Sequence, residues 1–183
     1  MNRKIGIFGG SFDPVHHGHL IAARDVMERH ALDEIIFVPA KVSPHKLGKE
    51  PTAFMFRASM LILSMRSLGY KWSVDMREGR REGPSYAIET VLELKKENPS
   101  ASFYYIIGDD NAAALPTWER YEELKEEVTF VVAERFAQTE EHGRKLHISS
   151  TEIRGRVKDG LPIDFLTPQI VIDYITENKI YKS

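Results

Sequence analysis

The chain has 183 residues, of which 42% are hydrophobic and 28% are charged, and this balance is that of an ordinary soluble globular protein. Its net charge of −2 excludes a generally basic surface for nucleic acid or for an anionic membrane, although a single pocket can still be basic. The sequence contains no cysteine, which excludes disulfides and thiolate zinc sites.

The length predicts one domain over residues 1–183, in which residues 148–183 form a helical C-terminal part. The apolar run near the start is too short and too glycine-broken for a signal peptide, and no stretch approaches the ~20 apolar residues of a membrane-spanning helix. We therefore expect a cytoplasmic protein with no membrane partner and no nucleic-acid partner. A homo-oligomer is compatible with the sequence.

Short apolar runs alternate with segments of helical period along the whole chain. Ser85 is expected to cap the third helix, and Thr167 to cap the last helix ahead of Pro168. The polar stretches 40–51 and 75–84 each follow a strand and are expected to be substrate loops. Strands are expected at 4–8, 35–38, 72–74, 103–107 and 128–132, and helices at 18–30, 52–65, 85–97, from 149 and from 167. This alternation predicts the α/β class, with a doubly wound parallel sheet covered by helices on both faces.

The segment 9–19, GGSFDPVHHGH, carries the first chemical signal. Its glycine turn follows the first strand and precedes a helix, which is where a doubly wound sheet binds phosphate. His16 and His19 are three residues apart and share one side of the first helical turn, so helix amides and two imidazoles can point at one anion. His17, between them, is expected to point elsewhere.

Other binding patterns fit this segment less well. A dinucleotide fingerprint would need a G-x-G-x-x-G run and an acidic residue after the second strand, and neither is present. A P-loop would need a Ser or Thr after Gly48-Lys49 and a glycine upstream. A zinc site would need a distant third ligand in a chain without cysteine. The remaining alternative is that the two histidines only pack at the helix start and bind no ligand.

The stretch His16-His17-Gly18-His19 is similar to the H-x-G-H signature of the nucleotidylyltransferase superfamily, and the Gly-Gly-Ser-Phe-Asp-Pro ahead of it resembles the nicotinate-mononucleotide adenylyltransferases in particular. The resemblance covers nearly the whole chain. It implies a Rossmann-like nucleotidylyltransferase fold. It also implies transfer of the adenylyl group of ATP to nicotinate mononucleotide, which gives nicotinate adenine dinucleotide and pyrophosphate in NAD biosynthesis. The residues with implied ATP-binding or catalytic roles in this segment are Gly9, Gly10, Ser11, Phe12, His16, Gly18 and His19.

A second motif places hydroxyls at a helix start and an arginine one turn later. Capping alone would explain Ser149 or Ser150, but it would not require Arg154, which can face the same anion. Residues 148–154 reproduce the superfamily's second signature, I-S-S-T-x-x-R, in full. The resemblance implies that these hydroxyls, with Thr151, hold the triphosphate of ATP, and that Arg154 is a catalytic residue.

Residues after the second and fourth strands complete the ATP site that the resemblance implies. Gly108 and Asp110 match the family's G-x-D pattern, which lies near the adenosine ribose, and Asp109 occupies a position that is usually small. Lys46 belongs to a Pro-His-Lys segment that meets phosphates in the family.

Two further segments imply a pocket for the pyridine ring. Trp118 follows Pro-Thr. Without the resemblance it would be interpreted as a packing residue, but in the family this tryptophan stacks on the pyridine ring. Ser85, Tyr86 and Ala87 resemble the family's S-Y-T turn, whose backbone amides meet the nicotinate carboxylate. Because Ala87 replaces the threonine, the amides are retained but a hydroxyl contact is lost, which bears on discrimination between acid and amide.

The attacking group in this reaction is the 5′-phosphate of nicotinate mononucleotide, which is already an anion at pH 7 and needs no general base. Catalysis then consists of positioning and of stabilising charge on the α-phosphate and the pyrophosphate. We expect His19 on the α-phosphate, with His16 and the glycine-turn amides around the phosphates. Mg²⁺ is expected to arrive on the ATP phosphates, because the sequence shows no carboxylate cluster that would cage it.

Three alternatives stay open at this point. Phosphopantetheine adenylyltransferase has a similar H-x-G-H, but it is usually shorter and lacks the Pro-Thr-Trp and Ser-Tyr segments. A second alternative is an enzyme that prefers the amide, nicotinamide mononucleotide. A nucleotide sensor without activity is the third, and the intact His16, His19 and Arg154 argue against it.

Overall fold

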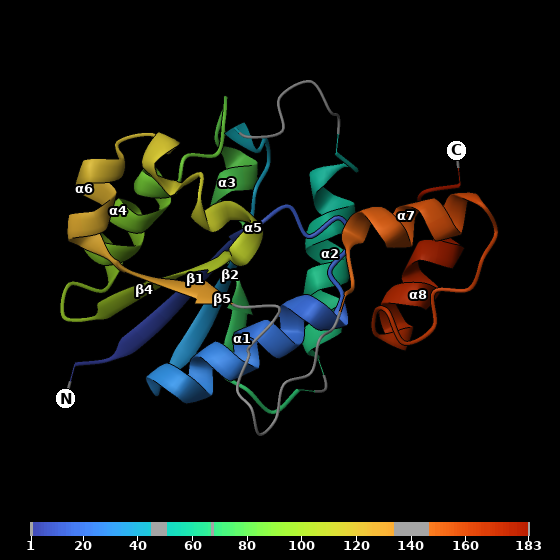
Figure 1. Cartoon of the computed structure of the whole chain (residues 1–183), viewed down its shortest axis with the longest axis horizontal. Coiled ribbons are helices and arrows are strands. Elements are labelled where there is room, and N and C mark those ends of the chain that lie inside the picture. The colour runs from blue at the N-terminus through green and yellow to red at the C-terminus, as the bar shows by residue number, and fades with distance from the viewer. Residues whose placement is uncertain (1, 45–50, 67, 134–146, 183) are drawn as a thin grey trace.

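The structure, a computed structural model, describes residues 2–44, 51–66, 68–133 and 147–182. Five parallel strands form one sheet in the order β3-β2-β1-β4-β5 (Figure 1). The predicted doubly wound parallel sheet is confirmed, and each strand lies where an apolar run predicted it. The strands are β1 (Lys4–Gly10), β2 (Glu34–Pro39), β3 (Trp72–Val74), β4 (Ser102–Gly108) and β5 (Thr129–Ala133).

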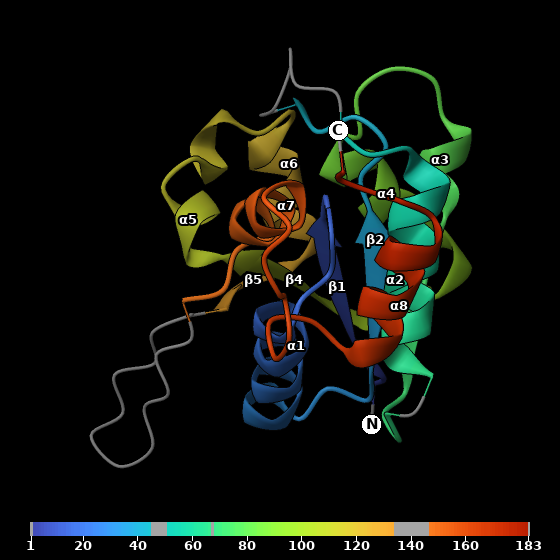
Figure 2. The same cartoon turned by 90° about the vertical axis from the view of Figure 1, so that its right-hand side faces the viewer.

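Helices cover both faces of the sheet (Figure 1). One face carries α1 (His17–His30) and α2 (Phe54–Met65), and the other carries α4 (Ala87–Glu97) and α6 (Tyr121–Glu127). The short helices in the connections are α3 (Arg77–Arg80), α5 (Asp109–Ala112) and η2 (Leu115–Thr117), and the chain ends with α7 (Ser150–Lys158) and α8 (Gln169–Glu177). α8 packs against α2 (Figure 2). No helix in the described ranges is long and apolar enough to cross a membrane.

Alternating side chains along the strands divide the core into two halves. Phe8 and Phe37 enter the half under α1 and α2, whereas Ile7 and Tyr105 enter the half under α4 and α6. Because these strands are buried on both faces, their sequences are nearly continuous apolar runs. Each fully buried aliphatic or aromatic side chain of this kind contributes roughly 1.5–3 kcal/mol, so the sheet is a stable platform for the loops at its edge.

The expected cap of the third helix is wrong. α4 begins after Tyr86, and the hydroxyl oxygen of Ser85 instead accepts hydrogen bonds from the main-chain N–H of Lys41 at 3.0 Å and of Val42 at 3.4 Å. The hydroxyl therefore ties the turn before α4 to the segment after β2. A local capping rule does not anticipate this bond, because its partners lie far away in the sequence.

The expected cap of the last helix is wrong for the same reason. α8 begins after Pro168, and the Thr167 hydroxyl donates to the main-chain carbonyl of Val15 at 2.8 Å. Thr167 is only 1% exposed, so its hydroxyl needs a partner, and the carbonyl supplies it.

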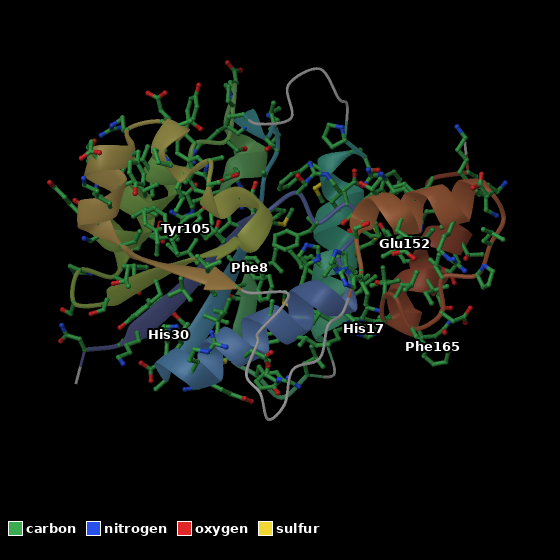
Figure 3. All side chains as sticks on the ribbon, viewed as in Figure 1. Phe8, His17, His30, Tyr105, Glu152 and Phe165 are labelled. Carbon is green, nitrogen blue, oxygen red and sulfur yellow. The ribbon has the colours of Figure 1, made fainter. Side chains whose placement is uncertain are left out.

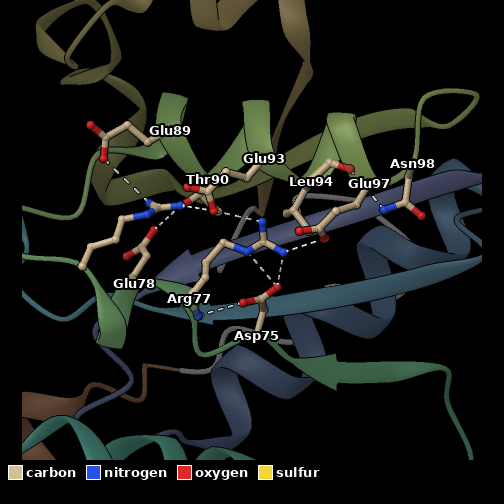
Figure 4. A network of polar contacts seen from close by, with 10 residues as sticks. Asp75, Arg77, Glu78, Glu89, Thr90, Glu93, Leu94, Glu97 and Asn98 are labelled. Atoms are coloured by element: carbon tan, nitrogen blue, oxygen red, sulfur yellow. Dashed lines mark hydrogen bonds and ion pairs between the residues drawn. The ribbon is translucent and has the colours of Figure 1, made fainter.

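A network of ion pairs holds α3 against α4 (Figure 4). The Arg77 guanidinium contacts the carboxylates of Asp75 at 2.7 Å, Glu97 at 2.8 Å and Glu93 at 3.1 Å. The stretch 75–84, which we expected to lack regular structure, thus contains a helical turn that is fixed to its neighbour. Pairings between charges on separate elements leave no periodic pattern in the sequence.

Candidate active site

The strand order indicates where a ligand would bind. The connections after β1 and before β4 lie on opposite faces of the sheet, so the carboxyl ends of these two strands form a topological switch point, the usual ligand site of doubly wound sheets. Residues 11–19, here termed the signature loop, begin at this point and continue into α1. In Figure 2 the arrowheads of β1 and β2 point to this end of the molecule.

His16 and His19 stand together at the start of α1. Their rings stack with centroids 3.7 Å apart and planes inclined by 30°, which confirms that they share one side of the first turn. The main-chain N–H of His16 donates to Nδ1 of His19 at 3.2 Å. Because Nδ1 accepts this bond, the proton of the neutral His19 ring lies on Nε2, which is then a hydrogen-bond donor.

Two glycines allow the backbone and the side chains to approach closely here. A Cβ at Gly18 would lie 3.0 Å from Nδ1 of the His16 imidazole. A Cβ at Gly9 would collide with the hydroxyl of Tyr105. Replacing either glycine would therefore displace a side chain that borders the site.

Phe12 anchors the signature loop in the core. It is 1% exposed, and its ring centroid lies 5.6 Å from that of Phe8 and 5.0 Å from that of the His19 imidazole. Its backbone has φ 46°, in the left-handed region that non-glycine residues rarely adopt. Because the ring is buried, a nucleotide could contact Phe12 only through the backbone, and the ring instead supports His19.

Arg57 is a residue of the site that no sequence motif indicates. It is 1% exposed, and its guanidinium donates to the main-chain carbonyls of Ser11 at 2.7 Å, Ala40 at 2.8 Å and Thr52 at 2.7 Å. These bonds join the signature loop to the segment after β2 and to the start of α2. Arg57 therefore fixes the spacing between two loops at the sheet edge.

The charge of Arg57 is kept in spite of its burial. Burial lowers the pKa of Arg57, and the nearby Asp13 carboxylate partly restores it, but a guanidinium remains protonated at any ordinary pH. The sequence signal for such a residue is a lone arginine on the apolar face of a helix, one turn before the buried Leu61.

The second motif combines a helix cap with a contact between side chains. The Ser149 hydroxyl accepts a hydrogen bond from the main-chain N–H of Glu152 at 3.1 Å, so it caps α7. One turn later, Nη2 of Arg154 lies 3.3 Å from the Thr151 hydroxyl oxygen. Capping therefore accounts for the hydroxyl of Ser149, whereas the hydroxyls of Ser150 and Thr151 make other contacts.

The same motif also holds the signature loop. The Ser150 hydroxyl donates to the Pro14 carbonyl at 2.9 Å, and Nη1 of Arg154 donates to the Asp13 carbonyl at 2.7 Å. Two motifs that lie far apart in the sequence are thus brought into direct contact. Residues expected to bind the triphosphate consequently lie beside the histidine pair.

A cavity of about 190 Å³ opens at the glycine turn after β1. This volume is below the ~300–1,000 Å³ of pockets that enclose a whole ligand, so it suits one ring and its substituent. The predicted site residues that line it are Gly9, Gly10, Ser11, Ser85, Tyr86, Ala87, Gly108 and Trp118, and the lining residues that were not predicted include Glu78 and Asn111.

Aromatic contacts hold Trp118 at the wall of this cavity. Its ring meets that of Tyr105 edge-on, with centroids 5.6 Å apart, and that of Phe130 at 6.4 Å. Trp118 is only half-buried, so the packing interpretation and the ring-stacking interpretation are both compatible with its position.

The turn before α4 offers fewer free amides than the family resemblance implies. The Ser85 N–H donates to the Val42 carbonyl at 2.9 Å, so this amide already has a protein partner. Tyr86 and Ala87 are the other residues of this turn that line the cavity. The Ser85 side chain and main chain both act as a link to the segment after β2.

Glu78 is a buried acid behind this turn (Figure 4). It is 5% exposed and accepts a hydrogen bond from the Thr90 hydroxyl at 2.7 Å. Burial raises the pKa of Glu78, and hydrogen bonds from Thr90 and Ser85 partly oppose that rise. No sequence pattern predicts the burial of Glu78, because it lies in a run of charges that is typical of a solvated surface.

The remaining predicted residues are placed as follows. Lys46 lies outside the described residues, and Asp110 belongs to α5, which begins directly after Gly108. His17 points away from the histidine pair as expected, and its ring is hydrogen-bonded to the backbone of Thr167. Burial lowers the pKa of His17, and this hydrogen bond partly opposes the lowering. Within the described ranges, no group of three or more His, Asp or Glu side chains could hold a metal ion.

Known proteins resemble this chain over its full length. Residues 7–156 match the model of the cytidylyltransferase-like family. The nicotinate-nucleotide adenylyltransferase of Bacillus subtilis is 38% identical, over 99% of this chain and 100% of its own length. A protein of Bacillus cytotoxicus, named a probable nicotinate-nucleotide adenylyltransferase, is 40% identical over the same shares of the two chains.

A solved structure shares the fold. The nicotinic acid mononucleotide adenylyltransferase of Plasmodium falciparum, complexed with NaAD, superposes with a TM-score of 0.80 and covers 98% of each chain. Its sequence identity is 19%, so this likeness concerns the arrangement of strands and helices alone.

Proposed function

We propose that this chain, which belongs to the nicotinate-nucleotide adenylyltransferases of the cytidylyltransferase-like family, transfers the adenylyl group of ATP to nicotinate mononucleotide. The products are nicotinate adenine dinucleotide and pyrophosphate. The observation that carries this proposal is that the stacked His16–His19 pair and the ring-sized cavity beside Trp118 lie at one edge of the sheet. The first suits a phosphate and the second suits a flat aromatic ring.

The reaction needs no proton transfer from the protein. An oxygen of the mononucleotide 5′-phosphate attacks the α-phosphorus of ATP, the bond between that phosphorus and the bridging oxygen breaks, and pyrophosphate leaves with the electron pair. The attacking group is already an anion, so the barrier comes from bringing two anions together and from charge on the α-phosphate. Imidazoles and helix amides that are in place before the substrates arrive lower this barrier.

The phosphate-binding roles follow from the positions of the side chains. Nε2–H of His19 would donate to the α-phosphate, because the bond from His16 keeps the proton on that nitrogen. His16 and the amides of residues 9–11 would surround the phosphates. Arg154 would hold the β- and γ-phosphates from the start of α7, where the helix dipole favours an anion. Ser150, whose hydroxyl proton is donated to Pro14, would contribute its main-chain N–H.

Other residues would complete the ATP site. Lys46 would approach the phosphates, and Gly108 and Asp110 would lie near the adenosine ribose. Thr151 and Ser149 would support the triphosphate from the first turn of α7. Phe12 and Gly18 would act by shaping the signature loop around the histidine pair.

The cavity would receive the pyridine ring. Trp118 would stack on the ring, and the amides of Tyr86 and Ala87 would donate to its carboxylate. These amides belong to the start of α4, a helix of 11 residues whose dipole also favours the negative charge there.

Mg²⁺ would accompany the ATP phosphates. The part of the chain that the structure describes offers imidazoles, a guanidinium and amide donors at the phosphate site, and no cluster of carboxylates that would cage a cation. This donor set fits a triphosphate that brings its own metal ion. Bound there, the ion would neutralise part of the charge on the triphosphate.

Pyrophosphate release tests the proposal directly. The purified protein with ATP is assayed side by side with nicotinate mononucleotide, nicotinamide mononucleotide and phosphopantetheine. We expect the highest kcat/KM with nicotinate mononucleotide. A higher value with phosphopantetheine would assign the protein to the other adenylyltransferase, and no release with any of them would exclude adenylyl transfer to these acceptors.

A further inference from the structure

The C-terminal part contacts the signature loop at consecutive residues. The carbonyls of Asp13, Pro14 and Val15 each accept a hydrogen bond from a side chain of this part, at 2.7, 2.9 and 2.8 Å, and the donors are Arg154, Ser150 and Thr167 in that order. The main-chain N–H of His17 then donates to the Leu166 carbonyl at 3.0 Å. The signature loop is thus held from Asp13 to His17 by residues of the C-terminal part.

Tyr181 adds a contact of a different kind. Its hydroxyl donates to Oδ1 of Asp13 at 2.7 Å, while Oδ2 of the same carboxylate accepts the main-chain N–H of Thr52 at 3.2 Å. Asp13 is 7% exposed, so its charge depends on these donors rather than on water. Burial raises the pKa of Tyr181, and the charge of Asp13 raises it further, so the hydroxyl stays a donor at any ordinary pH.

The backbone after α8 presents Tyr181 to the loop. Lys179 and Tyr181 have φ values of 53° and 65°, in the left-handed region, and Ile180 between them is buried, with its N–H bonded to the Ile175 carbonyl at 3.0 Å. Non-glycine residues adopt this conformation only where the surrounding structure holds them. Residues 179–181 therefore hold a backbone conformation in which the Tyr181 hydroxyl reaches Asp13.

We propose that Tyr181 is a positioning residue for adenylyl transfer, which holds the Asp13 carboxylate and thereby fixes the signature loop with His16 and His19. The inference rests on the proposed function for its consequence in catalysis. Rate depends steeply on such placement, since a shift of about 1 Å in a reacting or stabilising group costs ~10²-fold. In this role Tyr181 contacts no substrate and acts only through Asp13.

Tyr181→Phe is the sharpest variant, because it removes one hydroxyl and keeps the ring. We expect kcat to fall by about 10-fold or more, with the KM values for ATP and the mononucleotide little changed. Tyr174→Phe is the matched control: it removes a hydroxyl from α8, where the ring packs 6.3 Å from that of Phe56, and should leave kcat unchanged. A wild-type kcat in folded Tyr181→Phe would overturn the inference and leave the proposed function standing.

A second readout does not depend on activity. In Tyr181→Phe the imidazole NMR resonances of His16 and His19 should shift, while those of His30, at the other end of α1, should not (Figure 3). Asp13→Asn provides the second variant, and combining it with Tyr181→Phe should cost little more than either change alone, because both act through one contact. Unshifted His16 and His19 resonances, or fully additive losses, would contradict the positioning role even if the enzyme used a different acceptor.

Discussion

The main-chain N–H of His16 donates to Nδ1 of His19 at 3.2 Å, so the residue before α1 also orients the imidazole one turn later. This bond explains the spacing of the motif. A side chain at the third helical position can return to the capping residue, as in a capping box, and Gly18 between them leaves room for the His16 ring. Nε2 of His19 then carries the proton that would meet the α-phosphate.

We expect His19→Asn to lose as much activity as His19→Ala. Asparagine can still accept the N–H of His16, but it cannot reach the α-phosphate in place of Nε2. Loss of one preorganised donor typically costs ~10²–10³ in rate, and steady-state kcat measures it. His30→Ala, the same truncation at the opposite end of α1, should leave kcat unchanged. If His19→Asn kept more than about a tenth of the wild-type kcat, His19 would not be the α-phosphate ligand.

Arg154→Ala should chiefly weaken the binding of ATP, because its guanidinium would hold phosphates that are not transferred. Binding of nicotinate mononucleotide to the free enzyme should change little. Arg154→Lys keeps the charge but cannot make the paired contacts to Asp13 and Thr151, so it should recover only part of the affinity. Calorimetric titration with each substrate separately measures both effects, and a loss confined to the mononucleotide would refute the assignment.

The sheet could be predicted from the sequence because its central strands β1 and β2 are largely buried and show nearly continuous apolar runs. The short helices could not. α3 and α5 have four residues each, which is about one helical turn and too short to show a period. Their positions are set by what they contact, such as the ion pairs between α3 and α4, and not by an internal pattern.

In the site, too, contacts between residues close in the sequence could be predicted, and contacts between distant residues could not. His16 and His19 are three residues apart within one helical turn, so the motif alone was enough to predict that their rings lie together. Arg57 bonds to Ser11, which lies 46 residues away, and the Ser85 hydroxyl bonds to Lys41, which lies 44 residues away. A hydroxyl just before a helix predicts a cap from local rules, and only the fold reveals that two distant N–H groups compete for it.

Glu78→Gln should raise the free energy of unfolding near and above neutral pH, and this gain should shrink in acid. Burial raises the pKa of Glu78 above its unfolded value, so between those two pKa values the folded state binds more protons than the unfolded state. Wild-type stability therefore falls as the pH rises through this window, and glutamine, which does not titrate, avoids that loss.

Urea unfolding from about pH 4 to pH 8 measures the effect of Glu78→Gln, since this range begins near the unfolded pKa of glutamate. Glu89→Gln is the control, because this side chain is 46% exposed and lies 3.8 Å from Arg81, a surface pair that contributes little. A difference between wild type and Glu78→Gln that stayed constant with pH would show that the buried carboxyl does not titrate differently on folding.

Nicotinate mononucleotide should be preferred over nicotinamide mononucleotide by at least ~10-fold in kcat/KM, because a carboxamide would direct its own N–H₂ at backbone donors and leave at least one of them unpaired. An unpaired buried donor costs ~1–3 kcal/mol, or roughly 5- to 150-fold. Because the Ser85 N–H is bonded to the Val42 carbonyl, the backbone donors that would meet the carboxylate are the amides of Tyr86 and Ala87.

Two variants separate the sources of this acid preference. Trp118→Ala should raise KM for both mononucleotides by a similar factor, because the indole would stack on either ring and cannot distinguish them. Ala87→Thr adds a hydroxyl at the first position of α4 and should increase the preference for the acid, since a further donor would face the carboxylate. The comparison is made on kcat/KM for each substrate with each variant. Equal values for the two mononucleotides in the wild type would mean that the start of α4 does not select the acid and that the enzyme serves both.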